Sequence, residues 1–153
     1  MEKEEIVLKL IEKNIRIGSA ESLTGGLFAS TITSIPGVSK IFKGSIVSYS
    51  TLIKEKILRI DKETVDKYGV ISREIAEKMC MNAKEILDVD LAISFTGNAG
   101  PDAMEGKPVG RVYIGICYND IVETYELNFN GNRDEIRKKC VEKAFELIEL
   151  KIL

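Results

Sequence analysis

The chain has 153 residues, of which 44% are hydrophobic and 30% charged, and its formal net charge is −2. This composition is typical of one soluble globular domain spanning residues 1–153, and the absence of a basic balance disfavours nucleic acid as a partner. The sequence contains no histidine, which excludes the Ser-His-Asp triad, the Cys-His pair and the histidine-based zinc hydrolase. Any general base must therefore be Lys, Tyr, Asp, Glu or water.

The N-terminus and the cysteines exclude further classes. No apolar run reaches the roughly 20 residues that span a bilayer, and the acidic N-terminus lacks the basic start and apolar centre of a signal peptide. We therefore expect a cytoplasmic protein with no membrane partner. Cys80, Cys117 and Cys140 form no CxxC pair, which argues against a disulfide framework and a structural zinc site. We expect buried free thiols, no metal and no cofactor.

The first half of the chain alternates between helical and strand patterns. In chain order, the predicted elements are a helix over 4–13, a strand over 15–19, a polar turn over 20–26, a helix that ends at Ile35, a strand over 41–50, and helices over 52–58 and 62–68. The helices are predicted from apolar residues on one face, and the strands from compact apolar runs. Pro36 and Gly37 end the second helix.

The second half continues the alternation and adds a hairpin. Its predicted elements are a longer helix capped by Ser72, a strand over 91–95, a loop over 96–109, strands over 111–118 and 121–129, and a final helix over 131–153. Asn119 and Asp120 are predicted to form the two-residue turn between the last two strands. No internal repeat or linker interrupts the chain.

This order of elements predicts an α/β fold. We expect a three-layer α/β/α sandwich around a mixed, mostly parallel sheet of about five strands, in which the hairpin supplies one antiparallel member. Ligands of such sheets gather at the carboxyl ends of the strands. The polar loops 19–26 and 96–110 follow strands directly and are the expected site.

The first candidate for chemistry is Ser22 in the turn that precedes the second helix. Backbone N–H groups at the start of a helix lack intrahelical partners, so those of Thr24, Gly25 and Gly26 are expected to hold a phosphate or a developing oxyanion. A plain N-cap serine is the alternative, and it is the commoner use of such a residue.

The second candidate is the small-residue segment after the strand at 91–95. It comprises Thr96, Gly97, Asn98, Ala99, Gly100 and Pro101. Consecutive small residues can form a concave nest of N–H groups that binds an anion, and the hydroxyl of Thr96 can donate as well. An ordinary surface loop explains the segment equally well, because it is neither GxxxxGK[ST] nor GxGxxG.

Two further candidates are cationic. Lys54 follows Tyr49, and a lysine in an apolar pocket loses its proton near neutral pH and can act as a base, with tyrosine holding it or relaying a proton. Arg133, at the start of the last helix, can bind a phosphate through two of its guanidinium nitrogens. In each case a solvated surface charge is the alternative.

In this order, these segments resemble the C-terminal domain of the competence/damage-inducible protein CinA, a nicotinamide-nucleotide amidohydrolase family. The residues that carry the resemblance are Ala20 to Gly26, Pro36-Gly37, Val47 to Ser50 with Lys54, Gly69 to Ser72, Thr96 to Pro101, Lys107 to Gly110, and Gly131 to Arg133. The resemblance implies hydrolysis of the carboxamide of nicotinamide mononucleotide to nicotinate mononucleotide and ammonia. It departs from the family at Asp102 to Gly106, where a glycine tract is usual, and at Asn98, where an aliphatic residue is common.

Roles follow from this resemblance position by position. Ser22 corresponds to the nucleophile, Lys54 to its general base and Tyr49 to a partner of both, while Thr96 and Arg133 bind or orient the substrate. The expected substrate-binding residues are Thr24, Gly25, Gly26, Thr96, Gly97, Asn98, Gly100 and Arg133. A non-catalytic nucleotide-binding module and an amidase for another small amide are the alternatives. The hairpin leaves a sheet edge exposed, so we expect a homo-oligomer, most simply a dimer.

Overall fold

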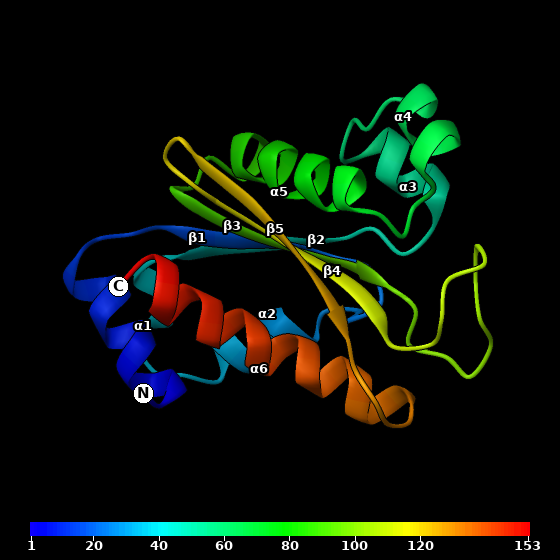
Figure 1. Cartoon of the computed structure of the whole chain (residues 1–153). Coiled ribbons are helices and arrows are strands. Elements are labelled where there is room, and N and C mark those ends of the chain that lie inside the picture. The colour runs from blue at the N-terminus through cyan, green and yellow to red at the C-terminus, as the bar shows by residue number, and fades with distance from the viewer.

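A five-stranded sheet lies between two layers of helices in the computed structural model, which describes residues 1–153 (Figure 1). The strands are β1 (Ile17–Glu21), β2 (Phe42–Val47), β3 (Leu91–Gly97), β4 (Arg111–Tyr118) and β5 (Ile121–Asn128). The helices are α1 (Lys3–Glu12), α2 (Leu27–Thr33), α3 (Thr51–Lys56), α4 (Lys62–Tyr68), α5 (Arg73–Leu87) and α6 (Arg133–Lys151), with a 3-10 turn η1 (Val38–Lys40). The predicted three-layer α/β/α sandwich is confirmed.

The strand order is β2-β1-β3-β4-β5. β1 runs parallel to both β2 and β3, whereas β4 is antiparallel to both β3 and β5, so β4 alone runs in the opposite direction. Tyr118 pairs with Ile121, which leaves Asn119 and Asp120 as the turn of the hairpin. Asn119 takes a φ of 52°, a left-handed conformation that asparagine tolerates.

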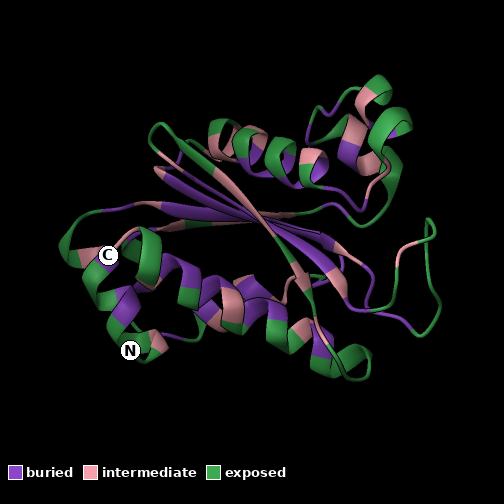
Figure 2. Ribbon diagram, viewed as in Figure 1, coloured by how far each residue is buried: buried purple, intermediate pink, exposed green.

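The central strands of the sheet are buried, as their purple colour in Figure 2 shows, and the two faces of the sheet bury different side chains. Large apolar residues of β3 and β4 pack against α1, α2 and α6, and they include Leu91, Ile93, Phe95, Val112, Ile114 and Ile116. On the opposite face, the space between the sheet and α5 is small. A Cβ added at Gly115 of β4 would come within 2.6 Å of the Ala76 carbonyl oxygen on α5. Beside α5 the side chains of this face are therefore mostly small, as at Ala20 and Ala92.

The register of the sheet places three strand ends side by side. Glu21, the last residue of β1, pairs with Val47 of β2 and with Phe95 of β3. Beyond these pairs, the N–H of Ser22 donates to the Phe95 carbonyl and the N–H of Ser48 donates to the Glu21 carbonyl. The turns after β1, β2 and β3 consequently meet at one edge of the sheet, which the sequence predicted for the turns after β1 and β3.

The predicted loop start at Thr96 is wrong. Thr96 pairs with Tyr113 and Gly97 with Val112, so both belong to β3. Their small or polar side chains gave no strand pattern, but the antiparallel partner β4 supplies the backbone hydrogen bonds that extend the strand.

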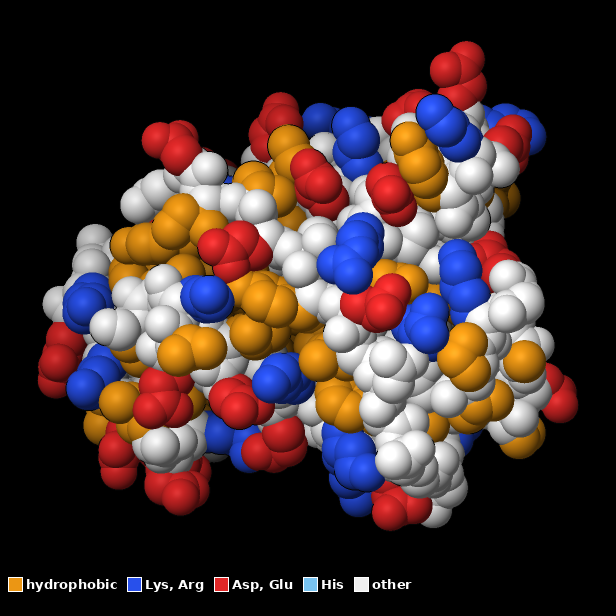
Figure 3. Space-filling view, in the orientation of Figure 1, with side chains coloured by type: hydrophobic (Ala, Val, Ile, Leu, Met, Phe, Trp, Pro, Cys, Tyr) orange, Lys and Arg blue, Asp and Glu red, His pale blue; other side chains and the backbone are white.

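The helices and the surface add two observations. None of the helices combines the length and apolar character needed to cross a bilayer. On the face drawn in Figure 3, lysine and arginine side chains are interspersed with aspartate and glutamate, without a continuous basic stripe.

Candidate active site

A pocket of about 550 Å3 opens at the carboxyl ends of the parallel strands. Its walls come from the turn after β1, the start of α3, Val70 and Ile71, the end of β3 with its following loop, and Arg133. This volume is within the range of roughly 300–1,000 Å3 that is usual for small-molecule sites. The pocket therefore contains the loops that the sequence predicted, at the predicted edge.

Ser22 and Lys54 meet at the base of this pocket. Lys54 Nζ lies 2.9 Å from Ser22 Oγ and 2.7 Å from the Ser48 carbonyl oxygen, with the Tyr49 carbonyl oxygen at 3.5 Å. The side chain of Ser50 caps α3 by accepting the N–H of Ile53, so α3 begins directly after β2. One turn into α3, Lys54 lies against the strand ends and is only 1% exposed. The convergence of the two predicted residues arises from this placement.

Burial changes the acid-base behaviour of Lys54. Removal from water lowers the pKa of its ammonium from 10.5 to about 8, against an opposing effect of the Glu105 carboxylate, which raises it. A neutral amine keeps two N–H donors and one lone pair. The carbonyls of Ser48 and Tyr49 can accept those donors, which leaves the lone pair to accept the hydroxyl proton of Ser22. The surroundings of Lys54 therefore suit its neutral form, which can act as a base.

The turn that holds Ser22 is organised by Glu21. Its buried carboxylate accepts the backbone N–H groups of Gly26, Phe28 and Ala29. The hydroxyls of two serines on β1 and β2 also donate to it; these are Ser19 and Ser45. The start of α2 is thus already occupied by an anion that belongs to the protein.

This occupancy corrects the predicted anion site at Thr24 to Gly26. The N–H of Gly26 donates to Glu21 and that of Gly25 to the Ser22 carbonyl, so neither is free. Thr24, Gly25 and Gly26 do not line the pocket, and the hydroxyl of Thr24 is buried without a partner. The error arose because sequence spacing identifies unpaired N–H groups at a helix start, but not the side chain that fills them.

The backbone immediately after Ser22 is available instead. The N–H groups of Leu23 and Thr24 make no hydrogen bond within the protein, and Leu23 lines the pocket. The carbonyls of the same two residues are held by Arg137, through Nε at 3.0 Å and Nη2 at 3.0 Å. The N–H that follows a nucleophilic serine is the usual oxyanion donor of serine hydrolases with a strand-turn-helix nucleophile. Leu23 is accordingly the best-placed donor.

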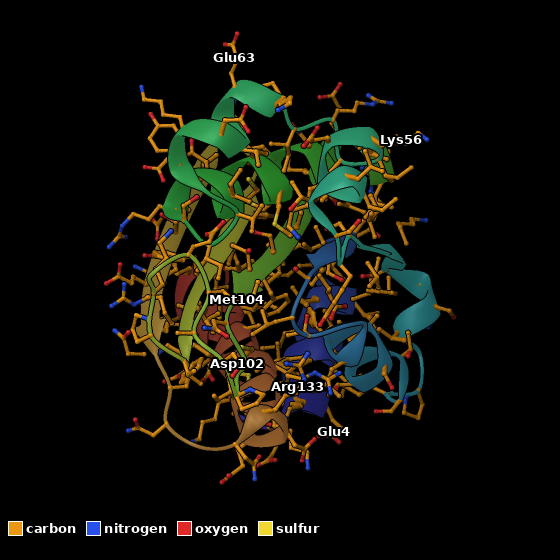
Figure 4. The ribbon with its side chains drawn as sticks, turned by 90° about the vertical axis from the view of Figure 1, so that its right-hand side faces the viewer. Glu4, Lys56, Glu63, Asp102, Met104 and Arg133 are labelled. Carbon is orange, nitrogen blue, oxygen red and sulfur yellow. The ribbon has the colours of Figure 1, made fainter.

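Tyr49 and Arg133 lie at the mouth of the pocket. The Tyr49 side chain is 61% exposed, and its hydroxyl accepts from Arg133 Nη2 at 2.8 Å. Arg133 Nη1 donates to the Gly100 carbonyl at 2.6 Å. Figure 4 shows Arg133 at the same end of the sheet as Asp102 and Met104, which also line the pocket. The Tyr49 hydroxyl therefore contacts Arg133, and only its backbone reaches Lys54.

The segment from Thr96 to Gly100 forms the opposite wall of the pocket. The hydroxyl of Thr96 donates to the Val70 carbonyl at 2.6 Å. Asn98 Oδ1 accepts the N–H of Gly100 at 3.0 Å, while its Nδ2 is buried without a partner. Gly97 lines the pocket beside them. The structure thus brings Thr96, Gly97, Asn98 and Gly100 together with Ser22, Lys54 and Arg133.

The family model described as CinA C-terminal domain matches residues 2–152. The chain belongs to the CinA C-terminal domain family. The resemblance that the motifs indicated is therefore confirmed across nearly the whole chain.

Curated relatives share this domain as part of longer proteins. One from Listeria innocua, provisionally named competence-damage inducible protein, is 42% identical over 145 residues. Its Bacillus subtilis counterpart of the same provisional name is 42% identical over 149 residues. The alignments cover 94% and 97% of this chain but 35% and 36% of those proteins. The chain spans about a third of the length of the relatives it matches.

Solved structures share the fold of this CinA C-terminal domain. The competence damage-inducible protein A of Klebsiella pneumoniae superposes with a TM-score of 0.94 at 25% identity, covering 99% of this chain and 98% of that chain. The competence/damage inducible protein CihA of Agrobacterium tumefaciens gives a TM-score of 0.89 at 30% identity, covering 97% and 94% respectively. The architecture is thus that of known CinA proteins.

Sequence reasoning missed several residues that shape the site of this CinA C-terminal domain. Glu21 was visible as a charged residue that ends an apolar strand, an arrangement that requires buried partners. Arg137 was visible as a second arginine four residues after Arg133, and residues at this spacing lie on the same helical face. No role was predicted for Glu105 or for Lys107, which the family motifs include, because the partners of both lie more than thirty residues away.

Proposed function

We propose that this CinA C-terminal domain hydrolyses the carboxamide of nicotinamide mononucleotide to nicotinate mononucleotide and ammonia. The observation that carries the proposal is the contact of 2.9 Å between Ser22 Oγ and Lys54 Nζ at the base of the pocket, combined with a lysine pKa of about 8. A histidine-free chain needs such a base, and Ser-Lys variants of the catalytic triad are known. Tyr49 stays a proposed member of the catalytic set, acting through Arg133.

Acylation begins with a proton transfer. The lone pair of Lys54 accepts the hydroxyl proton of Ser22 while Oγ forms a bond to the carboxamide carbon. The carbonyl oxygen becomes an oxyanion, which the N–H of Leu23 stabilises. The C–N bond then breaks, and the Lys54 ammonium returns its proton to the departing nitrogen. Ammonia leaves, and nicotinate mononucleotide remains as an ester of Ser22.

Deacylation uses the same groups in reverse. Neutral Lys54 removes a proton from a water molecule, whose oxygen bonds to the ester carbon. The bond between this carbon and Ser22 Oγ then breaks, and Oγ takes the proton from the Lys54 ammonium. The product acid releases its remaining proton to water and becomes a carboxylate, and the free serine is regenerated. The positive pyridinium ring assists both steps by withdrawing electrons from the carbonyl carbon.

The rest of the pocket suits the non-reacting part of such a substrate. Leu23, Val70, Ile71 and Met104 give it apolar walls, against which a planar ring can pack. Arg133 lies at its mouth, and a guanidinium is well suited to bind a phosphate. A nucleotide with its amide at the base and its phosphate at the mouth satisfies both ends.

A non-catalytic nucleotide-binding module is the rival of another class. Both proposals need the pocket, but only the amidase needs the Ser22 hydroxyl within reach of the Lys54 amine. The hydrogen bond between them supports the amidase. An amidase that acts on another small amide remains the second rival.

The test is product analysis. We expect the purified chain to convert nicotinamide mononucleotide into nicotinate mononucleotide with one ammonia per product, and nicotinamide riboside, which lacks the phosphate, much more slowly. A well-folded protein that binds the nucleotide and returns it unchanged would instead be a binding module. Equal rates on nucleotide and riboside would point to a different amide substrate.

A further inference from the structure

The loop between β3 and β4 forms one wall of the pocket although it is largely exposed. It projects from the sheet between these strands (Figure 1) and contributes Pro101, Asp102 and Met104 to the lining. Glu105 adopts a φ of 55° in this loop, a conformation that is uncommon for a residue with a side chain. Such a segment needs an external attachment to keep its shape.

One pair of side chains supplies that attachment. The two carboxylate oxygens of Glu105 accept the N–H groups of Val70 and Ile71, each at 3.0 Å. Lys107 Nζ donates to the Ile71 carbonyl and lies 3.6 Å from the Glu105 carboxylate. We call this arrangement the Glu105–Lys107 clamp. A Cβ added at Gly69 would lie 2.7 Å from a Glu105 oxygen, so the carboxylate rests closely on the backbone it binds.

The clamp is the only polar attachment of residues 101–107 to another segment. The other hydrogen bond within these residues is local, from the N–H of Lys107 to the Met104 carbonyl. On its far side, the 70–71 segment is fixed to the sheet by the hydroxyl of Thr96, which donates to Val70. The clamp therefore connects the loop to the part of the wall that the sheet holds.

Glu105 acts on the pocket from outside it. Val70, Ile71 and Met104 line the pocket, but Glu105 does not. Glu105 therefore fixes the wall of the pocket without being part of its lining. Loss of the clamp removes two hydrogen bonds to a charged acceptor, which are among the stronger ones in proteins.

We infer that Glu105 is a positioning residue: its carboxylate holds the 101–107 loop against Val70 and Ile71, and so sets the wall that binds the non-reacting part of the substrate. The inference rests on the proposed function for its effect on kinetics, but the clamp itself is independent of activity. A wall that contacts the substrate equally in the ground state and the transition state changes KM and leaves kcat nearly unchanged.

The test uses Glu105→Gln and Lys107→Met, with Glu63→Gln as a matched control. Glu63 is an exposed residue of α4 whose side chain extends into solvent (Figure 4) and forms no ion pair or hydrogen bond. The first readout is amide hydrogen exchange without ligand. In Glu105→Gln an NH2 group replaces one carboxylate oxygen, so one of the N–H groups of Val70 and Ile71 loses its acceptor and the other keeps only a neutral one. We expect at least one of these two N–H groups to exchange about tenfold faster than in the wild type, and the control to match the wild type.

The second readout is kinetics on nicotinamide mononucleotide at about pH 9, where Lys54 with its pKa of about 8 is already mostly neutral. We expect both clamp variants to raise KM about tenfold, which corresponds to about 1.4 kcal/mol, and to keep kcat within about threefold. Unchanged exchange at residues 70–71 would overturn the clamp. Faster exchange with unchanged KM, or with a loss confined to kcat, would overturn its positioning role.

The two proposals fail in distinguishable ways. If the wild type releases no ammonia, the amidase fails, but the exchange readout still decides whether Glu105 holds the wall. Nucleotide binding, measured by calorimetry on the same three variants, then replaces KM. In that case we expect the same tenfold weakening, about 1.4 kcal/mol, for the two clamp variants alone.

Discussion

The pH dependence of turnover tests the role of Lys54 as a general base. Its pKa of about 8, against an ordinary 10.5, follows from burial at the base of the pocket. At pH 7 about one tenth of a lysine with a pKa of 8 is neutral, whereas an ordinary lysine is neutral in about three molecules in ten thousand. Burial thus increases the reactive form by about 300-fold at neutral pH.

The assay is kcat/KM for ammonia release from about pH 7 to about pH 10, because the second pKa of a phosphate monoester lies near 6 and complicates lower values. The profile of kcat/KM reports the free enzyme. We expect a rise of about fivefold between pH 7 and pH 8, as the neutral fraction of Lys54 goes from about one tenth to about one half, and a plateau above about pH 9. Since the Glu105 carboxylate raises this pKa, Glu105→Gln should move the midpoint to lower pH. A flat profile over this range, or a midpoint near 10, would refute a buried lysine base.

Four further predictions concern stability, anchoring, recognition and assembly. The pKa of Lys54 is lower in the folded than in the unfolded chain, so its charge costs stability below pH 8, and this cost disappears as the pH rises from about 8 to about 10.4. Lys54→Met should therefore raise the free energy of unfolding at pH 7 by about 2 kcal/mol, measured by urea titration. An unchanged or lower free energy of unfolding would contradict the burial argument. Glu21→Gln replaces one carboxylate oxygen by an NH2 group that cannot accept, so some of the buried donors around it lose their acceptor. The change should cost about 3 kcal/mol, measured by the same titrations beside Glu12→Gln on the exposed face of α1. Arg133→Met should raise KM for the nucleotide by about tenfold or more and leave the riboside unaffected, whereas equal losses on both would exclude phosphate recognition. The outer edge of β5 is unpaired in the sheet, so we expect a homodimer by light scattering, and a monomer at micromolar concentration would rule it out.

Elements with a strong local pattern were predictable from the sequence. The bounds predicted for α4 and β4, residues 62–68 and 111–118, agree with the structure, because apolar spacing and turn residues define them without help from distant parts of the chain. Ser72 caps α5 as predicted, by accepting the N–H of Ile75. The strand ends were less predictable: β3 extends to Gly97 through its pairing with β4.

The site was predictable only where single residues carried the signal. Ser22 and Lys54 are 32 residues apart, and their contact depends on parallel pairing of β1 with β2. No local spacing contains that information. The availability of N–H groups in the turn after β1 likewise depended on Glu21, whose carboxylate takes the N–H of Gly26, one of the groups that the sequence had assigned to a ligand. Hydrogen bonds between distant segments decide both features.

The clamp illustrates the same limit in a loop. Glu105 and Lys107 lie in an exposed segment, where charged residues are usually solvated. Their function in the structure comes from the backbone of Val70 and Ile71, which the sheet brings beside them through Thr96. A sequence pattern cannot show that an exposed carboxylate faces two backbone N–H groups.

The central claim is that Ser22 and Lys54 together break an amide bond. Its most direct test is ammonia release from nicotinamide mononucleotide by the wild type, Ser22→Ala and Lys54→Met, assayed side by side after circular dichroism has shown that all three are folded. The account predicts release by the wild type and a loss of about a thousandfold or more in each variant. Near-normal release by folded Ser22→Ala would contradict it.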